Sequence, residues 1–291
     1  MLNQLASEPS VPGALVVVGT PIGNLGDLSA RGAEALRSAD AIACEDTRRT
    51  GRLLAHLGIT PPVLMVANQH TETARTSEIL DRLATGQRVA LVSDAGMPVV
   101  SDPGRRVVAA AALAGHRVEV VPGPVAATSA LAVSGLRGDR FVFEGFLPRK
   151  GAERAGRLAG IAAEPRTVVL YEAPHRLRRT LGDLVERCGA DRPAVVAREL
   201  TKLHEEVVRG SLAEVADHFE RFEPRGELVI MVAGAPLVGE PVDDEVLVAA
   251  LRASLDRGLS KRDAVADVVR ATGEAKRRVY DLAIGLPGAG R

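Results

Sequence analysis

The sequence predicts an α/β fold of two subdomains followed by a small all-α unit. Over most of the chain, short β-branched runs alternate with segments whose apolar residues recur at helical spacing, a pattern typical of a largely parallel sheet covered by helices. Two stretches rich in Gly and Pro, 122–124 and 233–241, interrupt this alternation, and only helical patterns follow the second. We therefore expect an N-terminal α/β subdomain over 12–122, a C-terminal α/β subdomain over 123–236 and a helical unit over 240–291.

The first subdomain is expected to contain a largely parallel sheet. Its strands are predicted at Ala14–Gly19, Asp40–Cys44, Val63–Ala67, Arg88–Ser93 and Arg117–Val121, and its helices at Ser29–Arg37, Thr47–Leu57, Thr71–Leu83 and Gly104–Ala114. Ligands bind outside the carboxyl ends of parallel strands. Three polar or Gly-rich segments fall at that edge and mark the expected ligand site: Gly19 to Asp27, Glu45 to Arg48, and Ser93 to Gly104.

The second subdomain has tighter spacing, so antiparallel pairing is plausible there. Strands are predicted at Phe141–Phe146, Thr167–Tyr171, Ala194–Arg198 and Leu228–Val232, with helices at Ala126–Ser134, Ala152–Ala162, Arg176–Arg187 and Leu212–Arg221.

The helical unit is predicted to hold helices at Asp243–Asp256, Ser260–Thr272 and Gly273–Ala283, with Ser260 as an N-cap. The last two have helix-turn-helix proportions. Seven basic and three acidic side chains between Arg257 and Arg278 favour contact with RNA or DNA. A packing or dimerisation module is the alternative, because 240–291 as a whole is charge-neutral.

Composition narrows the functional classes. With 46% hydrophobic residues, 25% charged residues and no apolar run near the roughly 20 residues of a membrane-spanning helix, a soluble globular protein is expected. The first ten residues lack the basic and apolar regions of a signal peptide, so a cytoplasmic location is expected. Cys44 and Cys188 are predicted to be reduced core thiols, and none of the six histidines has a metal-ligand spacing. The formal charge of zero argues against a general nucleic-acid binder.

The segment from Leu91 to Gly104 is the most informative part of the chain. A strand of the buried type runs into two Ser-Asp-x-Gly turns, in which Asp94 and Asp102 offer carboxylates that can receive an ammonium group or cap a helix. Such turns build ligand pockets, although an ordinary connection with N-caps is the alternative. The loop at 19–27 reads GTPIGNLGD, which is neither a dinucleotide nor a P-loop fingerprint, so a different small ligand is expected.

These motifs occur together, in this order, in one known family. GTPIGNLGDLS, EDTR, LVSDAGMPVVSDPG, VPGPVAATSAL, FEGFLPRKG, LYEAPHR and ARELTKLHEE make the chain resemble the small-subunit ribosomal RNA methyltransferase I (RsmI) family, which has the tetrapyrrole methylase fold. The resemblance covers about residues 12 to 236, and the tail resembles that family's helix-turn-helix extension. Met97 is a departure, because a threonine-like residue is expected there.

The resemblance implies an activity and its partners. The methyl donor that it implies is S-adenosylmethionine, which is expected to bind between the two α/β subdomains. The acceptor that it implies is the ribose 2′-hydroxyl of a cytidine in the decoding region of 16S rRNA, within the assembled small subunit. Relatives of this fold commonly pair two cores, so a homodimer is expected. No metal, membrane or DNA is expected to take part.

The resemblance also assigns donor-binding residues. The turn of Asp94, Ala95 and Gly96 resembles the loop that holds the methionine end, with Pro21 packing nearby. The other positions carried over are Val99, Ser129, Ala130, Leu170, Tyr171, Leu200 and Thr201. An adenine ring favours apolar walls, and the zwitterionic methionine end favours carboxylate and N–H groups. For Leu170 and Leu200 a plain core role is the alternative.

The reaction needs a proton acceptor, because a ribose hydroxyl is almost fully protonated near neutral pH. Asp46 is the first candidate, with Glu45 and Lys150 also assigned to the catalytic site, and the remaining acceptor candidates are Glu172, His175 and Glu199. The alternative for Asp46 is that it caps the following helix or orders the adjacent arginines. The expected phosphate contacts are Arg48, Arg49, Arg149, Lys150 and Arg176.

Two other functions remain open. A tetrapyrrole methylase shares the fold and the donor, although five Phe and two Tyr are few for a porphyrin pocket. A non-catalytic ribosome-assembly factor that binds RNA and retains a donor pocket is the third reading, and donor binding without turnover would identify it.

Overall fold

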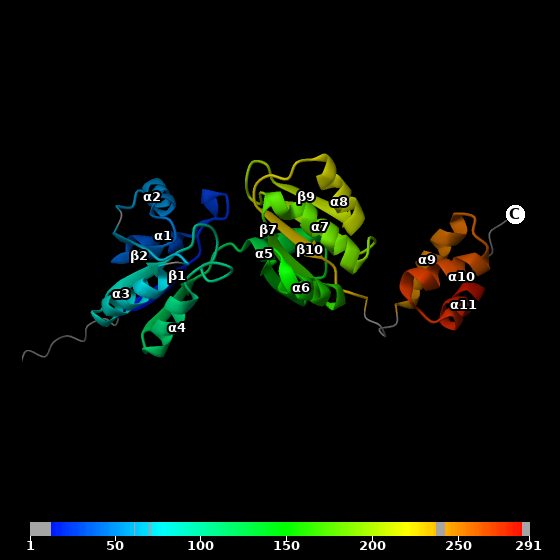
Figure 1. The fold of residues 1–291 in the computed structure, drawn as a ribbon, viewed down its shortest axis with the longest axis horizontal. Coiled ribbons are helices and arrows are strands. Elements are labelled where there is room, and N and C mark those ends of the chain that lie inside the picture. The colour runs from blue at the N-terminus through cyan, green and yellow to red at the C-terminus, as the bar shows by residue number, and fades with distance from the viewer. Residues whose placement is uncertain (1–12, 61, 70, 237–241, 287–291) are drawn as a thin grey trace, which may run out of the picture. The chain divides into compact units, whose positions relative to one another are not determined.

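The computed structural model describes residues 13–60, 62–69, 71–236 and 242–286, and these divide into one compact unit that runs to Ala235 and another that starts at Pro236 (Figure 1). The first ten residues, on which the expectation about a signal peptide rests, lie outside the described residues. So do the outer ends of the predicted subdomains at residues 12, 240 and 291.

The first sheet is parallel, as predicted, with the order β3-β2-β4-β1-β5. The strands are β1 (Ala14–Val18), β2 (Ala41–Cys44), β3 (Val63–Val66), β4 (Arg88–Leu91) and β5 (Arg117–Val121). The helices are α1 (Ala30–Arg37), α2 (Thr47–His56), α3 (Glu72–Ala84) and α4 (Arg105–Leu113), with a short 3₁₀ turn η1 (Leu25–Asp27).

Helices cover both faces of this sheet. Alternate strand residues point to opposite faces, so Val16 and Ile42 pack with Leu36 of α1 and Leu54 of α2. The neighbouring strand residues pack on the other face with α3 and α4, including Leu83. The winding reverses near β1 and β4, which places the loops after these two strands side by side. They are joined by the bonds Thr20 N to Gly96 O (2.9 Å) and Gly96 N to Thr20 O (3.1 Å).

The second sheet is mixed, with the order β6-β7-β10-β8-β9. The strands are β6 (Phe141–Phe146), β7 (Thr167–Glu172), β8 (Pro193–Arg198), β9 (Glu206–Ser211) and β10 (Leu228–Val232). Only the β6–β7 pair is parallel, which confirms the expected antiparallel pairing for the rest of the sheet. Strand β9 was not predicted. It lies at the edge of the sheet and is only half-buried, so its residues lack a strong burial pattern.

Helices cover this sheet unequally. One face packs against α6 (Gly151–Ala163), α7 (Pro174–Cys188) and α8 (Leu212–Arg221). The opposite face packs against α5 (Ala126–Ser134), through small side chains such as Ala127 and Ala130. Ile22, from the loop after β1, joins this second cluster, so the two sheets contribute to one apolar surface.

The C-terminal unit contains α9 (Asp244–Asp256), α10 (Lys261–Thr272) and α11 (Lys276–Ile284) around its own apolar core. Ser260 accepts a hydrogen bond from Asp263 N and so caps α10, as predicted. Gly273 adopts φ 71° and ends α10, which is why α11 begins three residues later than predicted. Among the described residues, no helix has the length and apolar character needed to cross a membrane.

Both cysteines are free thiols against apolar cores, as predicted. Cys44 is buried in the core beneath α1 and α2, and Cys188 packs against the core beneath α6, α7 and α8.

Candidate functional site

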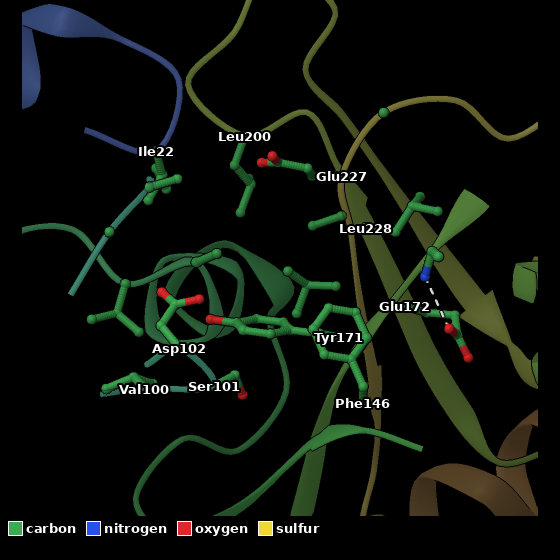
Figure 2. A pocket seen from close by; sticks show the side chains of 18 of the residues that line it. Ile22, Val100, Ser101, Asp102, Phe146, Tyr171, Glu172, Leu200, Glu227 and Leu228 are labelled. Carbon is green, nitrogen blue, oxygen red and sulfur yellow. Dashed lines mark hydrogen bonds between the residues drawn. The ribbon is translucent and has the colours of Figure 1, made fainter. Parts of the chain in front are cut away.

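A pocket of about 350 Å³ opens between the two sheets of the first unit, and Figure 2 shows its lining. Most of its wall is apolar and comes from segments far apart in sequence. The first sheet contributes Ile22 and the loop at 95–102. The second sheet and α5 contribute the opposite wall, which includes Val125, Phe146, Tyr171, Leu200 and Val229. We call this the main pocket.

The loop that forms one wall is held in an unusual backbone conformation. Val99 and Ser101 have φ values of 76° and 63°, a region that side chains other than Gly rarely adopt and that costs about 1–3 kcal/mol per residue. The buried carboxylate of Glu72 holds the end of the loop, because it accepts hydrogen bonds from Gly104 N (3.0 Å) and Arg106 N (2.9 Å). Glu72 therefore caps the start of α4, because it accepts hydrogen bonds from N–H groups that have no partner within the helix.

This arrangement leaves Asp102 without a capping role. Gly104 occupies the N-cap position of α4, and no side chain at that position makes a capping bond. The alternative that Asp102 caps this helix is therefore wrong. Its half-buried carboxylate lines the main pocket instead.

Asp102 lies among other carboxylates. Burial, followed by the negative charge of Glu45, raises the pKa of Asp102 to about 7. A hydrogen bond from Ser93 opposes this shift, whereas the charges of Asp94 and Glu227 add to it. Burial also raises the pKa of Glu45. The polar part of the main pocket is therefore acidic, and a cationic group bound there would favour the charged form of the Asp102 carboxyl.

Tyr171 forms the centre of the opposite wall. Its hydroxyl oxygen accepts a hydrogen bond from Ala127 N (3.2 Å) at the start of α5. Its ring meets Phe143 and Phe146 edge to face, with centroid distances of 4.9 and 5.6 Å. These contacts fix the ring, and burial raises the pKa of the phenol.

Two glycines let the loops around the pocket approach closely. A Cβ atom at Gly19 would lie 2.6 Å from the Cα and N atoms of Gly123 and 2.6 Å from Met97 Sδ. The Pro122-Gly-Pro124 turn therefore packs directly on the loop after β1. Met97, which departs from the threonine-like residue expected there, lines the main pocket.

A smaller pocket of about 190 Å³ lies at the carboxyl ends of β1, β2 and β4. It is lined by Thr20, Pro21, Leu25, Arg49, Thr50, Arg52, Leu53, Ser93 and Asp94. Arg49 Nε lies 3.5 Å from Asp94 Oδ2, and Asp94 Oδ1 accepts a hydrogen bond from Asp46 N (3.1 Å). This pocket brings guanidinium groups to the same sheet edge as the main pocket.

Known proteins share this sequence and this fold. A family profile described as Tetrapyrrole (Corrin/Porphyrin) Methylases matches residues 14–216. Two curated relatives are named Ribosomal RNA small subunit methyltransferase I. The protein from Synechocystis sp. is 45% identical, and the match covers 96% of this chain and 100% of that protein. The protein from Mycobacterium tuberculosis CDC 1551 is 44% identical, and the match covers 94% of this chain and 95% of that protein. The chain belongs to the Ribosomal RNA small subunit methyltransferase I family.

Solved structures share the fold at lower identity. The methyltransferase CobJ has a TM-score of 0.60 at 23% identity, with 79% of this chain and 97% of CobJ covered. A uroporphyrin-III C-methyltransferase from Thermus thermophilus, complexed with S-adenyl homocysteine, has a TM-score of 0.53 at 24% identity, with 75% and 96% covered. At these identities the likeness establishes the α/β two-sheet tetrapyrrole methylase fold and nothing further.

In this member of the methyltransferase I family, the residues expected to bind the donor divide among several places. Ala95, Gly96, Tyr171 and Leu200 line the main pocket. Pro21 and Asp94 line the smaller pocket. Ala130 is buried behind the α5 wall, and Val99, Ser129 and Thr201 line neither pocket.

Leu170 is the clearest mismatch among them. Its side chain is 1% exposed and packs with α6, α7 and α8, on the face of the sheet away from the main pocket. Adjacent strand residues point to opposite faces, so Tyr171 faces the pocket because Leu170 does not. The core role weighed for Leu170 is the one observed. Leu200 is 9% exposed and both lines the pocket and joins its apolar cluster.

Asp46 lies in neither pocket. Its Oδ1 accepts a hydrogen bond from Arg48 N (2.8 Å), which caps α2, and its Oδ2 lies 3.2 Å from Arg48 Nη2. The hydrogen bonds from Arg48 lower the pKa of the Asp46 carboxyl. This geometry favours the capping alternative over the role of proton acceptor.

The other catalytic candidates are likewise engaged or distant from the main pocket. Glu172 Oε2 accepts from Thr180 Oγ1 (2.6 Å), and its Oε1 accepts from Ala173 N (2.9 Å), the bond dashed in Figure 2. Glu199 pairs with Lys202 at 2.7 Å. The remaining candidates stand outside the lining of the main pocket: Glu45, Lys150 and His175.

The expected phosphate contacts also differ in availability. Arg48, Arg149 and Lys150 are exposed, although Arg48 is tied to Asp46. Arg176 is bound within the protein, 3.2 Å from Glu172 Oε1 and donating to Leu147 O at 2.6 Å. Arg52, which was not predicted, is exposed and lines the smaller pocket beside Arg49.

Sequence reasoning did not identify several lining residues of the main pocket, including Ile22, Phe146 and Glu227. Ile22 falls within the GTPIGNLGD loop, which carried a usable signal. Glu227 stands in a segment whose position over the pocket depends on the pairing of β10 between β7 and β8. Among the described residues, no group of three or more His, Cys, Asp or Glu side chains is arranged to hold a metal ion.

Proposed function

We propose that this protein transfers a methyl group from S-adenosylmethionine to the ribose 2′-hydroxyl of a cytidine in the decoding region of 16S rRNA, within the small ribosomal subunit. The similarity over nearly the whole chain to proteins named Ribosomal RNA small subunit methyltransferase I supports ribosomal RNA of the small subunit as the substrate. The observation that carries the donor is the main pocket, in which a largely apolar wall lies beside unneutralised carboxylate. A ribosomal substrate of this kind implies that the protein acts in the cytoplasm.

The residues of the main pocket fit this donor. A volume of about 350 Å³ falls in the range of small-molecule sites, which is roughly 300–1,000 Å³. Ile22, Leu200 and Val229 supply apolar surface for an adenosine group. The carboxylate of Glu227 suits the ammonium charge of the donor. When bound, the donor supplies a methyl group on positively charged sulfur, which is open to attack by an oxygen nucleophile.

The smaller pocket suits the RNA side of the reaction. Arg49 and Arg52 offer guanidinium groups that can pair with phosphate at the carboxyl edge of the first sheet. Exposed Arg149 and Lys150 are further candidates for phosphate contact. Holding the nucleotide here would orient its ribose toward the main pocket, and such orientation is a large part of catalysis in a two-substrate reaction.

The homodimer remains a prediction. In the first unit, β5 is an edge strand with exposed Val118 and Val120, and Leu113 of α4 is 91% exposed. An exposed apolar surface of this kind suits an interface between copies. Sedimentation equilibrium of the full chain would test it, since a monomer mass at micromolar concentration contradicts the expectation.

The function is tested by methyl transfer from labelled S-adenosylmethionine to purified small subunits that lack this modification. Nuclease mapping should place the label in one 2′-O-methylcytidine of 16S rRNA. Label in another nucleotide or on the base would contradict the proposed site. If the donor binds and no label is transferred, a tetrapyrrole substrate or a binding-only assembly factor becomes the better explanation.

A further inference from the structure

Asp102 differs from the other acidic residues near the site because it faces the main pocket without a cationic partner. Among the described residues, no lysine or arginine forms an ion pair with it. Its negative charge contributes to the raised pKa of the Tyr171 phenol. Figure 2 shows the Asp102 carboxylate beside the hydroxyl end of Tyr171, below Ile22. Its oxygens are therefore available to a bound molecule.

Asp102 also lies beside a residue of the smaller pocket. Its hydrogen-bonding neighbour Ser93 lines the smaller pocket, whereas Asp102 itself lines the main pocket. Thr20, another residue of the smaller pocket, donates through Oγ1 to Ser93 O (3.2 Å). Asp102 is therefore a carboxylate of the main pocket that has a direct neighbour in the lining of the smaller pocket.

The neighbouring carboxylates are each committed elsewhere. Asp94 accepts from Asp46 N and lies against Arg49. Glu45 accepts from Asp94 N (3.2 Å) and does not line the main pocket. Glu227 lies 3.2 Å from the Lys202 ammonium, and its side chain is 67% exposed. Asp102 is thus the pocket carboxylate best placed to exchange a proton.

We propose that Asp102 accepts the proton of the ribose hydroxyl during methyl transfer. This inference rests on the proposed function. As the ribose oxygen forms its bond to the methyl carbon, the carbon–sulfur bond breaks and its electron pair remains on sulfur. The hydroxyl proton moves to a carboxylate oxygen of Asp102, which later releases it to water. The atoms and charges balance without another reactant.

The surroundings of Asp102 suit this role. The charged and titratable groups that face it are Glu45 after β2, Asp94 after β4, Glu227 before β10 and Tyr171 on β7. With its pKa raised to about 7, the carboxyl is a stronger base than an ordinary aspartate and is still substantially ionised at neutral pH. The rate should therefore rise with pH up to about 7 and then level off.

The test compares Asp102→Asn with Asp191→Asn, a matched substitution at an exposed turn residue between α7 and β8. Both variants are titrated with S-adenosylhomocysteine and with S-adenosylmethionine by calorimetry, and turnover is measured on small subunits from pH 5.5 to 8.5. We expect Asp102→Asn to bind both ligands within about threefold of the wild type, to lose roughly 10²- to 10⁴-fold in turnover and to lose the pH-dependent limb. Asp191→Asn should match the wild type throughout.

A readout independent of activity is the titration of the carboxyl itself. Carbon-13 NMR of aspartate-labelled protein should contain a carboxyl that titrates near pH 7 in the wild type and in Asp191→Asn, and not in Asp102→Asn.

Other outcomes overturn the proposal. Equal loss of both ligands would make Asp102 a donor-binding residue, and selective loss of S-adenosylmethionine would make it a stabiliser of the sulfonium charge. Turnover by Asp102→Asn within tenfold of the wild type would assign the proton to another group. If the wild type itself transfers no label to the subunit while the carboxyl still titrates near pH 7, the proposed function fails and the environment of Asp102 is unaffected.

Discussion

Replacing Asp102 with Asn should stabilise the protein at neutral pH. The carboxyl has a pKa of about 7 in the folded state against 3.8 for the unperturbed group, so folding favours its protonated form. Between these two pH values the unfolded chain releases a proton that the folded chain retains, and the free energy of unfolding therefore falls as pH rises. The loss is complete above pH 7 and absent below pH 3.8.

The size of the effect follows from the same pKa difference. At about 1.4 kcal/mol per pH unit, a rise from 3.8 to about 7 corresponds to a ceiling of about 4 kcal/mol. Asp102 is only half-buried, and solvent screening reduces this to roughly 1–2 kcal/mol. Asn has nearly the shape of protonated Asp and stays neutral at every pH, so the packing around residue 102 is kept.

Urea unfolding of the full chain, followed by circular dichroism at pH 4.5, 6 and 8, measures this difference. The stability gap between Asp102→Asn and the wild type should open between pH 4.5 and pH 8, and the matched Asp191→Asn variant should have no such trend. A gap that is constant with pH, or one that closes as pH rises, would refute the assigned electrostatics. A residue retained at a cost in stability is expected where function requires it.

Three further predictions concern packing and capping. Gly19→Ala should weaken binding of S-adenosylhomocysteine at least tenfold and lower Tm, because its Cβ would lie 2.6 Å from Gly123 backbone atoms; Gly51→Ala, whose Cβ meets no atom within 4 Å, is the control, and equal behaviour of the two would contradict the close approach. Leu170→Ala should lower the free energy of unfolding by about 2–5 kcal/mol, whereas the affinity of the folded variant for S-adenosylhomocysteine should change less than threefold. A larger loss of affinity, measured by calorimetry, would place Leu170 in the wall of the binding pocket. Asp46→Ala should cost about 0.5–2 kcal/mol through the lost cap and keep most methyl transfer, whereas a hundredfold fall in turnover would restore it as the proton acceptor.

Much of the fold follows from local patterns in the sequence. The strand at Ala14–Val18 is a continuous run of apolar, mainly β-branched residues, and all five are buried, as a central parallel strand requires. Ser29 and Ser260 accept the capping bonds at the starts of α1 and α10. These features depend on neighbours along the chain, so the sequence alone carries them. The positions of the pocket loops also follow, because parallel strands end at a common edge.

The sequence motifs determined the family, the order of the elements and the loops that surround the site. Tertiary structure decided which side chains within those loops do which task. In β7 the apolar run leaves Leu170 and Tyr171 equally eligible for the pocket, and only the packing of α6, α7 and α8 on one face separates them. Asp102 was recognisable as a carboxylate near the site, but its freedom from capping depends on Glu72, which lies far back in the chain. Burial and charge are sums over groups that meet only after folding, so no local pattern can supply them.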